Sequence, residues 1–400
     1  MSLHEEQSLP LAGIRVVEFV HMVMGPTCGL LLADLGAEVI KVEPVPEGDN
    51  TRRLMGSGAG YWMTYNRNKK SFAVDIKSEE GMAAVKKLIA TADVVTENFR
   101  PGAMEKLGLG YEQVKAIKPD IIYSSMKGFL PGPYEKRTAL DEVVQMMTGL
   151  AYMTGPVGRP LRAGASVNDV MGGMFSTVSI LAALLQRKES GRGQFVQTGL
   201  FENSAFLVAQ HMMQKVVTGK AAAPMPSRIS AWAIYDVFET SEEGEQVFMG
   251  VVSDSQWVAF CETFDFPELG SDTELSRNNQ RVQARDRIIP LVRERLSGMD
   301  KQTVMALCEK AGLPFSPIQR PEDMFEDEHL NQSGGMAELT LPDGEQVKVP
   351  MLPFEMNGQR FGTRLNVPSL GSHSRELLAQ LGYGDDDITQ LEASGTVKTA

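Results

Sequence analysis

Short strand-like runs alternate with helical patterns over residues 13–126, and this alternation constrains the fold more than any other feature of the chain. Helical spacing separates the runs at 27–35, 78–92 and 111–117. Because a strand–helix–strand repeat places its strands parallel, the sequence predicts an α/β fold with a doubly wound parallel sheet. The runs are GIRVVEF (13–19), AEVIKVE (37–43), SFAVDI (71–76), DVVTENF (93–99) and DIIYSSM (120–126).

Ligands of such a sheet bind beyond the carboxyl ends of its strands, where this chain has polar loops at 21–25, 43–53 and 98–102. No G-x-G-x-x-G pattern follows a predicted strand, and no G-x-x-x-x-G-K-[ST] pattern occurs. The chain therefore lacks the phosphate loops of NAD-dependent dehydrogenases and of P-loop nucleotide hydrolases.

Composition excludes several kinds of partner. The 400 residues carry a formal net charge of −12, so nucleic acid and anionic membrane surfaces are poor partners. Cys28, Cys261 and Cys308 form no C-x-x-C pair and the five histidines have no metal spacing, so we expect neither disulfides nor a metal. The N-terminal stretch lacks the regions of a signal peptide, and no run of about 18 apolar residues occurs. We expect a cytoplasmic protein without a membrane partner.

The later part of the chain predicts a second, smaller α/β domain. Residues 1–200 are expected to form the first part of the large domain, 201–224 a linker, 225–325 the small domain, and 326–400 a linker and the return to the large domain. The elements expected here are a helix at 196–217, a hairpin at 233–240 and 246–252, helices at 255–264, 278–296 and 301–311, further strands at 336–353 and a terminal helix at 374–381.

Asp169 stands in a small, glycine-rich stretch, GASVNDVMGG, ahead of a long apolar helix. A carboxylate just outside a helix N-terminus accepts backbone N–H bonds and lies in a favourable dipole, so it stays ionised and available as a nucleophile. A plain capping role is the alternative. Gly172 and Gly173 favour the catalytic interpretation, because each glycine costs a helix about 1 kcal/mol and lets a bulky group approach the backbone.

Several segments together identify a family. The chain resembles the class III coenzyme A transferases, also called the CaiB/BaiF or formyl-CoA transferase family, in order from about residue 11 to residue 375. The segments are EFVHMVMGP, LLADLGAEVIKVEP, GDNTR, NRNKKSFAVDIKS, TENFRPGAMEKLGLGYE, DEVVQMMTGL, VNDVMGGMFSTVSILAALLQRKESGRGQ and AGLPFSPI.

The resemblance implies a Rossmann-like large domain, a smaller inserted domain and a homodimer whose two chains interlock. It also implies that Asp169 is the nucleophile, that an acyl-CoA and a small carboxylic acid are the substrates, and that CoA acts as substrate without a permanently bound cofactor. The Asp169 carboxylate attacks the acyl-CoA thioester, an aspartyl-CoA thioester forms, and the incoming acid takes the CoA. Gly172 and Gly173 are expected to leave space for the oxyanion of the tetrahedral intermediates.

By the same resemblance, CoA contacts are expected in the loops after the strands. Asp141 matches an acidic position that the family places near the nucleophile, where it either orients a carbonyl and sets the local field or caps the helix that follows it. The expected CoA contacts are Val23, Met24, Val74, Lys77, Asn98, Phe99, Arg100, Lys106 and Arg137.

Three departures from the family pattern argue against oxalate and formyl-CoA as substrates. Pro44 stands where many relatives have an arginine, Val23 stands where formyl-CoA transferases have a glutamine, and the glycine-rich loop of the oxalate enzymes is missing near 230–235. His21, Arg52, Arg53 and Arg67 near the strand ends favour a second substrate carboxylate, and a small dicarboxylate such as succinate is therefore expected. The alternative for each arginine is that it faces the CoA phosphates or solvent.

Two other activities are weighed against this one. An α-methylacyl-CoA racemase shares the fold and uses a histidine before the aspartate at position 141, but this chain has Leu140 there, which cannot transfer a proton. A non-catalytic acyl-CoA-binding subunit would have no need of a carboxylate at the thioester, and Asp169 is present. A CoA-transferase is the prediction.

Overall fold

The computed structural model describes residues 9–228, 230–341 and 344–399, and it divides into two compact units. Unit 1 is formed by the chain up to Pro226 and from Glu328 onward, and unit 2 by Ser227–Asp327. The N-terminal segment on which the signal-peptide prediction rests, with His4, lies mostly outside the described residues, because residues 1–8 are not among them. The predicted linker at 201–224 is wrong for most of its length, because α9 (Leu200–Thr218) is a helix of unit 1.

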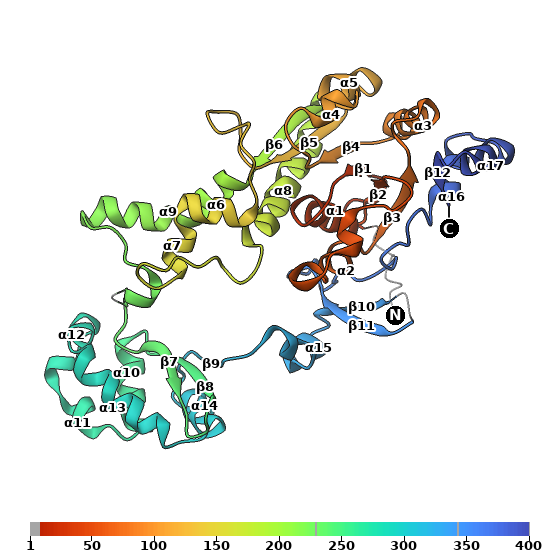
Figure 1. The fold of residues 1–400 in the computed structure, drawn as a ribbon. Coiled ribbons are helices and arrows are strands. Elements are labelled where there is room, and N and C mark those ends of the chain that lie inside the picture. The colour runs from red at the N-terminus through yellow and green to blue at the C-terminus, as the bar shows by residue number, and fades with distance from the viewer. Residues whose placement is uncertain (1–8, 229, 342–343, 400) are drawn as a thin grey trace. The chain divides into compact units, whose positions relative to one another are not determined.

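Unit 1 is built on a seven-stranded sheet in the order β12-β3-β2-β1-β4-β5-β6 (Figure 1). All neighbours are parallel except β12, which pairs antiparallel with β3 at the edge of the sheet. The structure therefore confirms the predicted α/β fold with a parallel-dominated sheet. The strands are β1 (Arg15–Phe19), β2 (Glu38–Glu43), β3 (Lys69–Val74), β4 (Val94–Glu97), β5 (Ile122–Lys127), β6 (Gln194–Gly199) and β12 (Val397–Lys398).

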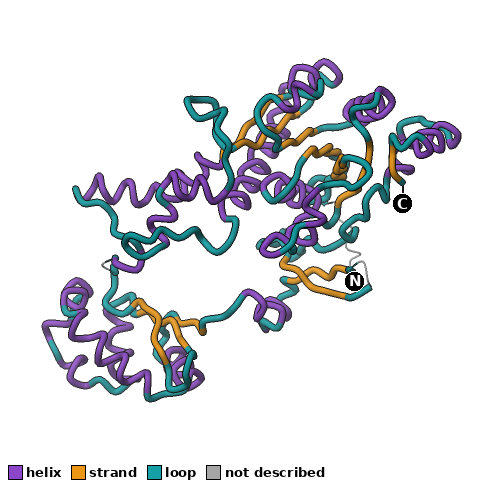
Figure 2. Tube along the Cα trace, viewed as in Figure 1, coloured by secondary structure: helices purple, strands orange, loops and turns teal. Residues whose placement is uncertain are grey.

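Alternating side chains explain why this sheet has helices on both faces. Val17 and Val95 belong to one buried cluster, while their neighbours Val16 and Val94 belong to another. Because successive strand residues point to opposite faces, each apolar run supplies both clusters. Figures 1 and 2 show the strands lying between the two groups of helices.

The first cluster is covered by α3, α5, α16 and α17, and the second by α1, α6 and α8. Ser78 accepts a hydrogen bond from Gly81 N at the start of α3, which confirms the predicted capped helix. The helices of unit 1 are α1 (Met24–Asp34), α2 (Tyr61–Tyr65), α3 (Glu79–Ala90), α4 (Ala103–Lys106), α5 (Tyr111–Ile117), α6 (Asp141–Thr148), α7 (Leu150–Thr154), α8 (Val167–Ser190), α9, α15 (Glu328–Gln332), α16 (Ser374–Gln380) and α17 (Asp385–Ala393).

Two elements of unit 1 differ from the sequence prediction. The helix predicted over 196–217 begins only at Leu200, because 194–199 pairs with β5 as strand β6. The chain also continues past the predicted terminal helix into α17 and β12. The strands predicted over 336–353 are confirmed as the antiparallel hairpin β10 (Met336–Thr340) and β11 (Gln346–Pro350).

Unit 2 has its own core and its own three-stranded antiparallel sheet, in the order β7-β8-β9. The predicted hairpin is confirmed as β7 and β8, whereas the helix predicted over 278–296 is divided into α12 and α13. The elements are β7 (Tyr235–Glu239), β8 (Gln246–Gly250), α10 (Asp254–Thr263), α11 (Pro267–Ser271), α12 (Asn278–Gln283), α13 (Arg285–Ser297), α14 (Lys301–Lys310) and β9 (Phe315–Pro317).

Helix α8 packs against α1 through its two glycines. A Cβ atom on Gly173 would lie 2.8 Å from the carbonyl oxygen of Met24 and 2.7 Å from Cβ of Thr27, and one on Gly172 would lie 2.5 Å from Cε of Met24. The bulky group that approaches these glycines is therefore helix α1. The predicted role as space for an oxyanion does not fit this geometry, because α1 fills that space.

Helix α8 is also the one helix among the described residues that is long and apolar enough to cross a membrane, and 44% of its apolar window is buried within the structure. The prediction that no apolar run of about this length occurs is therefore wrong for 167–190. The core helix of a soluble protein passes the same test, so this observation by itself assigns no membrane role.

Replacing Gly173 with alanine separates packing from helix propensity. Propensity alone predicts that Gly173→Ala stabilises α8 by about 1 kcal/mol. The contact with Met24 O predicts a loss of about 1–3 kcal/mol instead, because backbone atoms cannot move aside cheaply. Chemical denaturation of Gly173→Ala checks this, with Ala83→Gly, at an exposed position inside α3, as a control that reports helix propensity alone. A stabilised Gly173→Ala protein would contradict the packing role.

Candidate active site

A cavity of about 750 Å³ opens in unit 1 beyond the carboxyl ends of β1, β2, β4 and β5. It lies where a doubly wound sheet is expected to bind its ligand. Its walls come from the β1–α1 loop, the start of the loop after β2, the loops after β4 and β5, the start of α6 and the segment that leads into α8. The first loop contributes residues 20–24, the loop after β4 contributes 98–101, and α6 and α8 contribute Asp141 and Asp169.

The β1–α1 loop is held in place by polar contacts that sequence patterns do not reveal. His21 N donates to Asn98 Oδ1 at 3.0 Å, and Asn98 Nδ2 donates back to His21 O at 2.9 Å. Met22, in the left-handed region at φ 63°, donates its N–H to Thr51 Oγ1. The His21 ring stacks on Phe99 with 5.2 Å between ring centroids, and burial lowers the pKa of His21. Asn98 therefore positions a cavity wall as well as lining it.

Asp141 joins α6 to the N-terminus of α8. Its Oδ2 accepts hydrogen bonds from Asn168 N at 2.7 Å and from Asp169 N at 3.2 Å. Its Oδ1 accepts from Gln145 Nε2, and Gln145 Oε1 accepts from Ala163 N at 2.8 Å. Asp141 is the first residue of α6 and makes no cap bond to its own helix, so it caps α8 instead. Of the two interpretations left open for Asp141, capping of the helix that follows it is wrong.

Asp169 lies inside the first turn of α8, not outside the helix as predicted. Burial and, to a smaller extent, the neighbouring Asp141 carboxylate together raise the pKa of Asp169 to about 7, against the opposite effect of Arg162. The prediction that helix contacts keep this carboxylate ionised is therefore wrong for the free protein. The backbone N–H of Asp169 goes to Asp141, and that carboxylate sets a negative field at Asp169.

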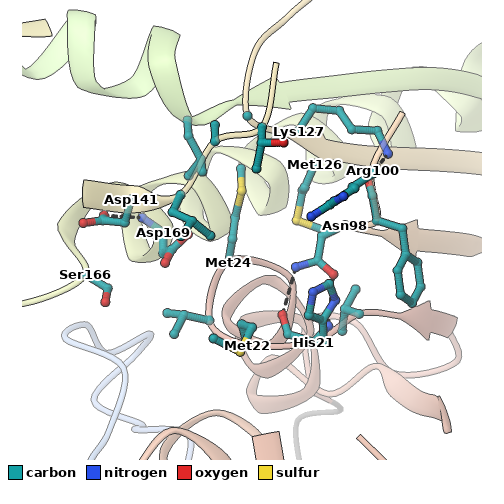
Figure 3. A pocket seen from close by; sticks show the side chains of 18 of the residues that line it. His21, Met22, Met24, Asn98, Arg100, Met126, Lys127, Asp141, Ser166 and Asp169 are labelled. Atoms are coloured by element: carbon teal, nitrogen blue, oxygen red, sulfur yellow. Dashed lines mark hydrogen bonds between the residues drawn. The ribbon is translucent and has the colours of Figure 1, made fainter. Parts of the chain in front are cut away.

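The structure brings most of the predicted site residues together around the cavity (Figure 3). Figure 3 shows Asp141, Ser166 and Asp169 on one side of the pocket and Arg100 and Lys127 on the other. The predicted residues that line it are Val23, Met24, Asn98, Phe99, Arg100, Arg137, Asp141 and Asp169. Those that do not line it are Val74, Lys77, Lys106, Gly172 and Gly173.

Val74 is fully buried in β3 opposite Val397, while Lys77 and Lys106 are exposed. Their contact with CoA stays a prediction. Pro44, where a CoA contact was expected to be missing, forms part of the cavity wall, and so does Leu140, which is 64% exposed at the position of the racemase histidine.

Three arginines proposed for a second substrate carboxylate are used elsewhere. Arg67 is buried and paired with Asp34 at 2.6 Å. Arg52 pairs with the buried Glu43 at 2.7 Å and stacks on Trp62, and Arg53 pairs with Glu47 at 3.2 Å. None of these arginines lines the cavity, so the prediction is wrong for them. Of the group named for this role, His21 alone is a lining residue.

The structure adds site residues that the sequence did not indicate. Arg162 and Ser166 line the cavity from the segment before α8, and Tyr61 lines it from α2 with its hydroxyl 3.4 Å from Ser166 Oγ. Gln145 holds the segment through Ala163 N. No motif spacing links α2, α6 and 162–166, so only the fold brings these residues together.

Comparison with known proteins defines the class of protein first. The chain matches CoA-transferase family III over residues 11–374. A CaiB/BaiF family protein from Brucella suis has a similar structure, with a TM-score of 0.83 and 33% identity over 94% of this chain and 100% of that one. The chain therefore belongs to CoA-transferase family III, also called the CaiB/BaiF family, and it is a CoA-transferase.

Two curated relatives are CoA-transferases named for particular substrates. The succinyl-CoA:glutarate CoA-transferase of Mus musculus is 32% identical, over 97% of this chain and 90% of the relative. The succinate–glutarate CoA-transferase of Agrobacterium fabrum is 32% identical, over 93% of this chain and 96% of the relative. These alignments span both units.

The raised pKa of Asp169 makes a stability prediction. The native carboxyl keeps its proton up to about pH 7, whereas the unfolded one loses it near its ordinary value, so the free energy of unfolding falls as pH rises between these two values. Asp169→Asn removes this loss. We expect it to gain about 1–3 kcal/mol relative to the wild type between pH 5 and pH 8. Denaturation midpoints at both pH values check this, with the exposed Asp386→Asn as a control. If Asp169→Asn and the wild type differed in stability by the same amount at pH 5 and at pH 8, the raised pKa of Asp169 would be contradicted.

Proposed function

We propose that this CoA-transferase moves CoA between small carboxylic acids, at least one of them a dicarboxylate, through a covalent aspartyl-CoA intermediate on Asp169. The observation that carries the proposal is the position of Asp169. It is a half-buried carboxylate at the wall of a large cavity beyond the strand ends, and its backbone is fixed by a second carboxylate. Covalent catalysis at such a group keeps the thioester free energy that hydrolysis would lose.

In the first half-reaction, an Asp169 oxygen attacks the thioester carbonyl carbon of the acyl-CoA donor. The tetrahedral intermediate expels CoA thiolate and leaves a mixed anhydride. The thiolate then attacks the aspartyl carbonyl carbon, the C–O bond to the donor acyl group breaks, and the donor acid leaves as a carboxylate. The acceptor carboxylate reverses these steps on the aspartyl-CoA thioester, and no proton is gained or lost overall.

Two features of the site affect this chemistry, the pKa of Asp169 and the hydroxyl groups near it. The raised pKa of Asp169 means that its carboxyl is partly protonated in the free protein at pH 7. Because only the ionised carboxylate attacks the thioester, the rate of the first attack rises as the pH rises through about 7. Ser166 and Tyr61 carry hydroxyl groups at the Asp169 side of the cavity and are suited to donate to the oxyanion. They take the place of the glycine pair that the sequence suggested.

The CoA moiety is proposed to lie in the part of the cavity formed by the loops after β4 and β5. Arg100 and Arg137 line this region with positive charge, and Asn98 and Phe99 form its wall. Met24, the first residue of α1, lies between Asp169 and Arg100 in Figure 3, and Val23, directly before it, also lines the cavity. Lys127 contributes less charge than its position suggests, because its ammonium is bound to both oxygens of Glu97.

A dicarboxylate is proposed because relatives across the full length of the chain are named for succinate and glutarate. Which dicarboxylate this chain uses is a question of cavity shape. The racemase alternative gains no support, since Leu140 provides no base at the cavity. The cytoplasm stays the predicted compartment.

Trapping the intermediate tests the proposal. We expect incubation with succinyl-CoA and other acyl-CoA donors to charge Asp169, and hydroxylamine to convert the thioester to a hydroxamate that peptide mapping locates. Asp169→Ala removes the nucleophile and is expected to lower transfer by more than about 10³-fold. Its CoA affinity is expected to stay within about threefold of the wild type. Normal turnover by Asp169→Ala, or an adduct elsewhere with none at Asp169, would overturn the mechanism.

We further infer that the protein is a homodimer. Large apolar side chains are exposed on α6, α8 and α9, and monomeric proteins rarely leave such a set uncovered. A second copy covering these helices agrees with the interlocked dimer that the family resemblance implies. The exposed residues are Val143, Met146, Met147, Met174, Val178, Leu185, Phe206, Leu207, Met212, Met213, Val216 and Val217.

Light scattering after size-exclusion chromatography checks the dimer. We expect twice the chain mass of 43.8 kDa for the wild type and for Asp169→Ala. Val178→Glu and Val216→Glu place charges on the exposed apolar set and are expected to reduce the dimer fraction, whereas Lys188→Glu, at an exposed charged position on α8, is the control. A wild-type monomer would contradict the inference, and flotation of that monomer with lipid vesicles would assign the apolar face to a membrane.

A further inference from the structure

The cations around the cavity divide into two groups. Arg100 and Arg137 belong to the loops after β4 and β5, and Lys127, the last residue of β5, is bound to Glu97 and Phe99 O. The other group is a single residue among the described lining residues, Arg162, in the segment before α8. Arg162 is the arginine whose charge acts on Asp169, where it lowers the pKa.

Arg162 is held only loosely by its neighbours. Its Nε donates to Ala163 O at 3.1 Å. Its Nη2 lies 3.6 Å from Asp141 Oδ1 and its Nη1 lies 3.6 Å from Glu142 Oε2, and both separations are too long for hydrogen bonds. Asp141 Oδ1 already accepts from Gln145, and Asp141 Oδ2 accepts from the helix α8 backbone. The two terminal nitrogens of a half-buried guanidinium therefore keep donors for another carboxylate.

The charges near Asp169 require such a cation. Asp141, Glu142 and Asp169 line this part of the cavity, and an acid substrate brings further negative charge into it. A dicarboxylate has one carboxylate that must reach the aspartyl thioester and one that stays charged throughout. Arg52, Arg53 and Arg67 cannot bind the second one, because each is paired with another carboxylate outside the cavity.

We propose that Arg162 binds the non-reacting carboxylate of the acid substrate and thereby makes the site prefer dicarboxylates to monocarboxylates of the same length. This proposal rests on the proposed function for the acid side of the reaction. The guanidinium lies 3.6 Å from the Asp141 carboxylate, and the other oxygen of that carboxylate accepts from the Asp169 backbone, so Arg162 and the nucleophile lie on the same side of the cavity. Its planar donors match a carboxylate in a way that a lysine ammonium does not.

Equilibrium binding tests this without relying on turnover. The Asp169→Asn protein is saturated with CoA, and calorimetry measures its affinity for glutarate and for valerate, which has a methyl group in place of the second carboxyl. Adding Arg162→Gln is expected to weaken glutarate binding about 10- to 100-fold, because one charge-assisted pair is lost. The valerate affinity is expected to change less than about threefold.

Two further variants control the result. Arg162→Lys keeps the charge without the planar fork and is expected to retain part of the glutarate affinity. Arg159→Gln makes the same change of charge at an exposed position of the same segment that does not line the cavity, and it is expected to leave both affinities unchanged. Thermal unfolding of each variant establishes that it is folded.

The outcomes separate this proposal from the covalent mechanism. Unchanged glutarate affinity without Arg162, or equal weakening of glutarate and valerate, would overturn the role of Arg162 and leave the aspartyl-CoA intermediate untouched. Valerate binding is undetectable in Asp169→Asn, with or without Arg162→Gln, if the site needs the second carboxylate for any affinity. In that case, loss of detectable glutarate binding on adding Arg162→Gln supports the proposal. Failure to trap the intermediate would overturn the mechanism alone, since binding to Asp169→Asn involves no chemistry.

Discussion

The Asp141 carboxylate is the contact on which the candidate site depends. One of its oxygens satisfies two backbone N–H groups at the start of α8, and the other is held by Gln145, which also binds the segment that carries Arg162. Helix α6, the start of α8 and the preceding segment are therefore fixed by one side chain. The same carboxylate places a negative charge beside Asp169, so the group that orders the site also raises the pKa of its nucleophile.

This arrangement joins structural order to reactivity. A carboxylate held in a partly buried, negative environment has a smaller hydration shell to lose when a substrate excludes water, and it gains a stronger attraction to any positive centre. The close approach of α1 and α8 at Gly173 keeps the start of α8 against the loop that carries Val23 and Met24. The wall of the cavity and the nucleophile are consequently parts of one packed body.

Sequence patterns predict those parts of the fold that depend on local spacing. The five strands before residue 130 and the cap at Ser78 are examples, because apolar alternation and capping chemistry act over a few residues. Strand β6 was missed because its pattern runs into a helix, and its pairing with β5 is a long-range contact. The roles of Gln145 and Arg162, and the pairing of Arg67 with Asp34, likewise depend on contacts between distant segments. Asp169 itself was found from its glycine-rich stretch ahead of α8 and then from the family motif, but its pKa was not, since burial is a property of the folded chain.

The sheet of unit 1 is completed by a short strand that lies far along the chain from its partner. Val397 and Lys398 of β12 pair with β3, more than three hundred residues earlier, and Ile388 and Leu391 of α17 join the same buried cluster as α3. During synthesis, the β3 edge therefore stays open until Val397 and Lys398 have left the ribosome, whereas unit 2, which is contiguous in sequence, has all its strands and its core much earlier. Loss of β12 would leave the β3 edge unpaired and open to pairing with another chain, in the unit that holds the candidate active site.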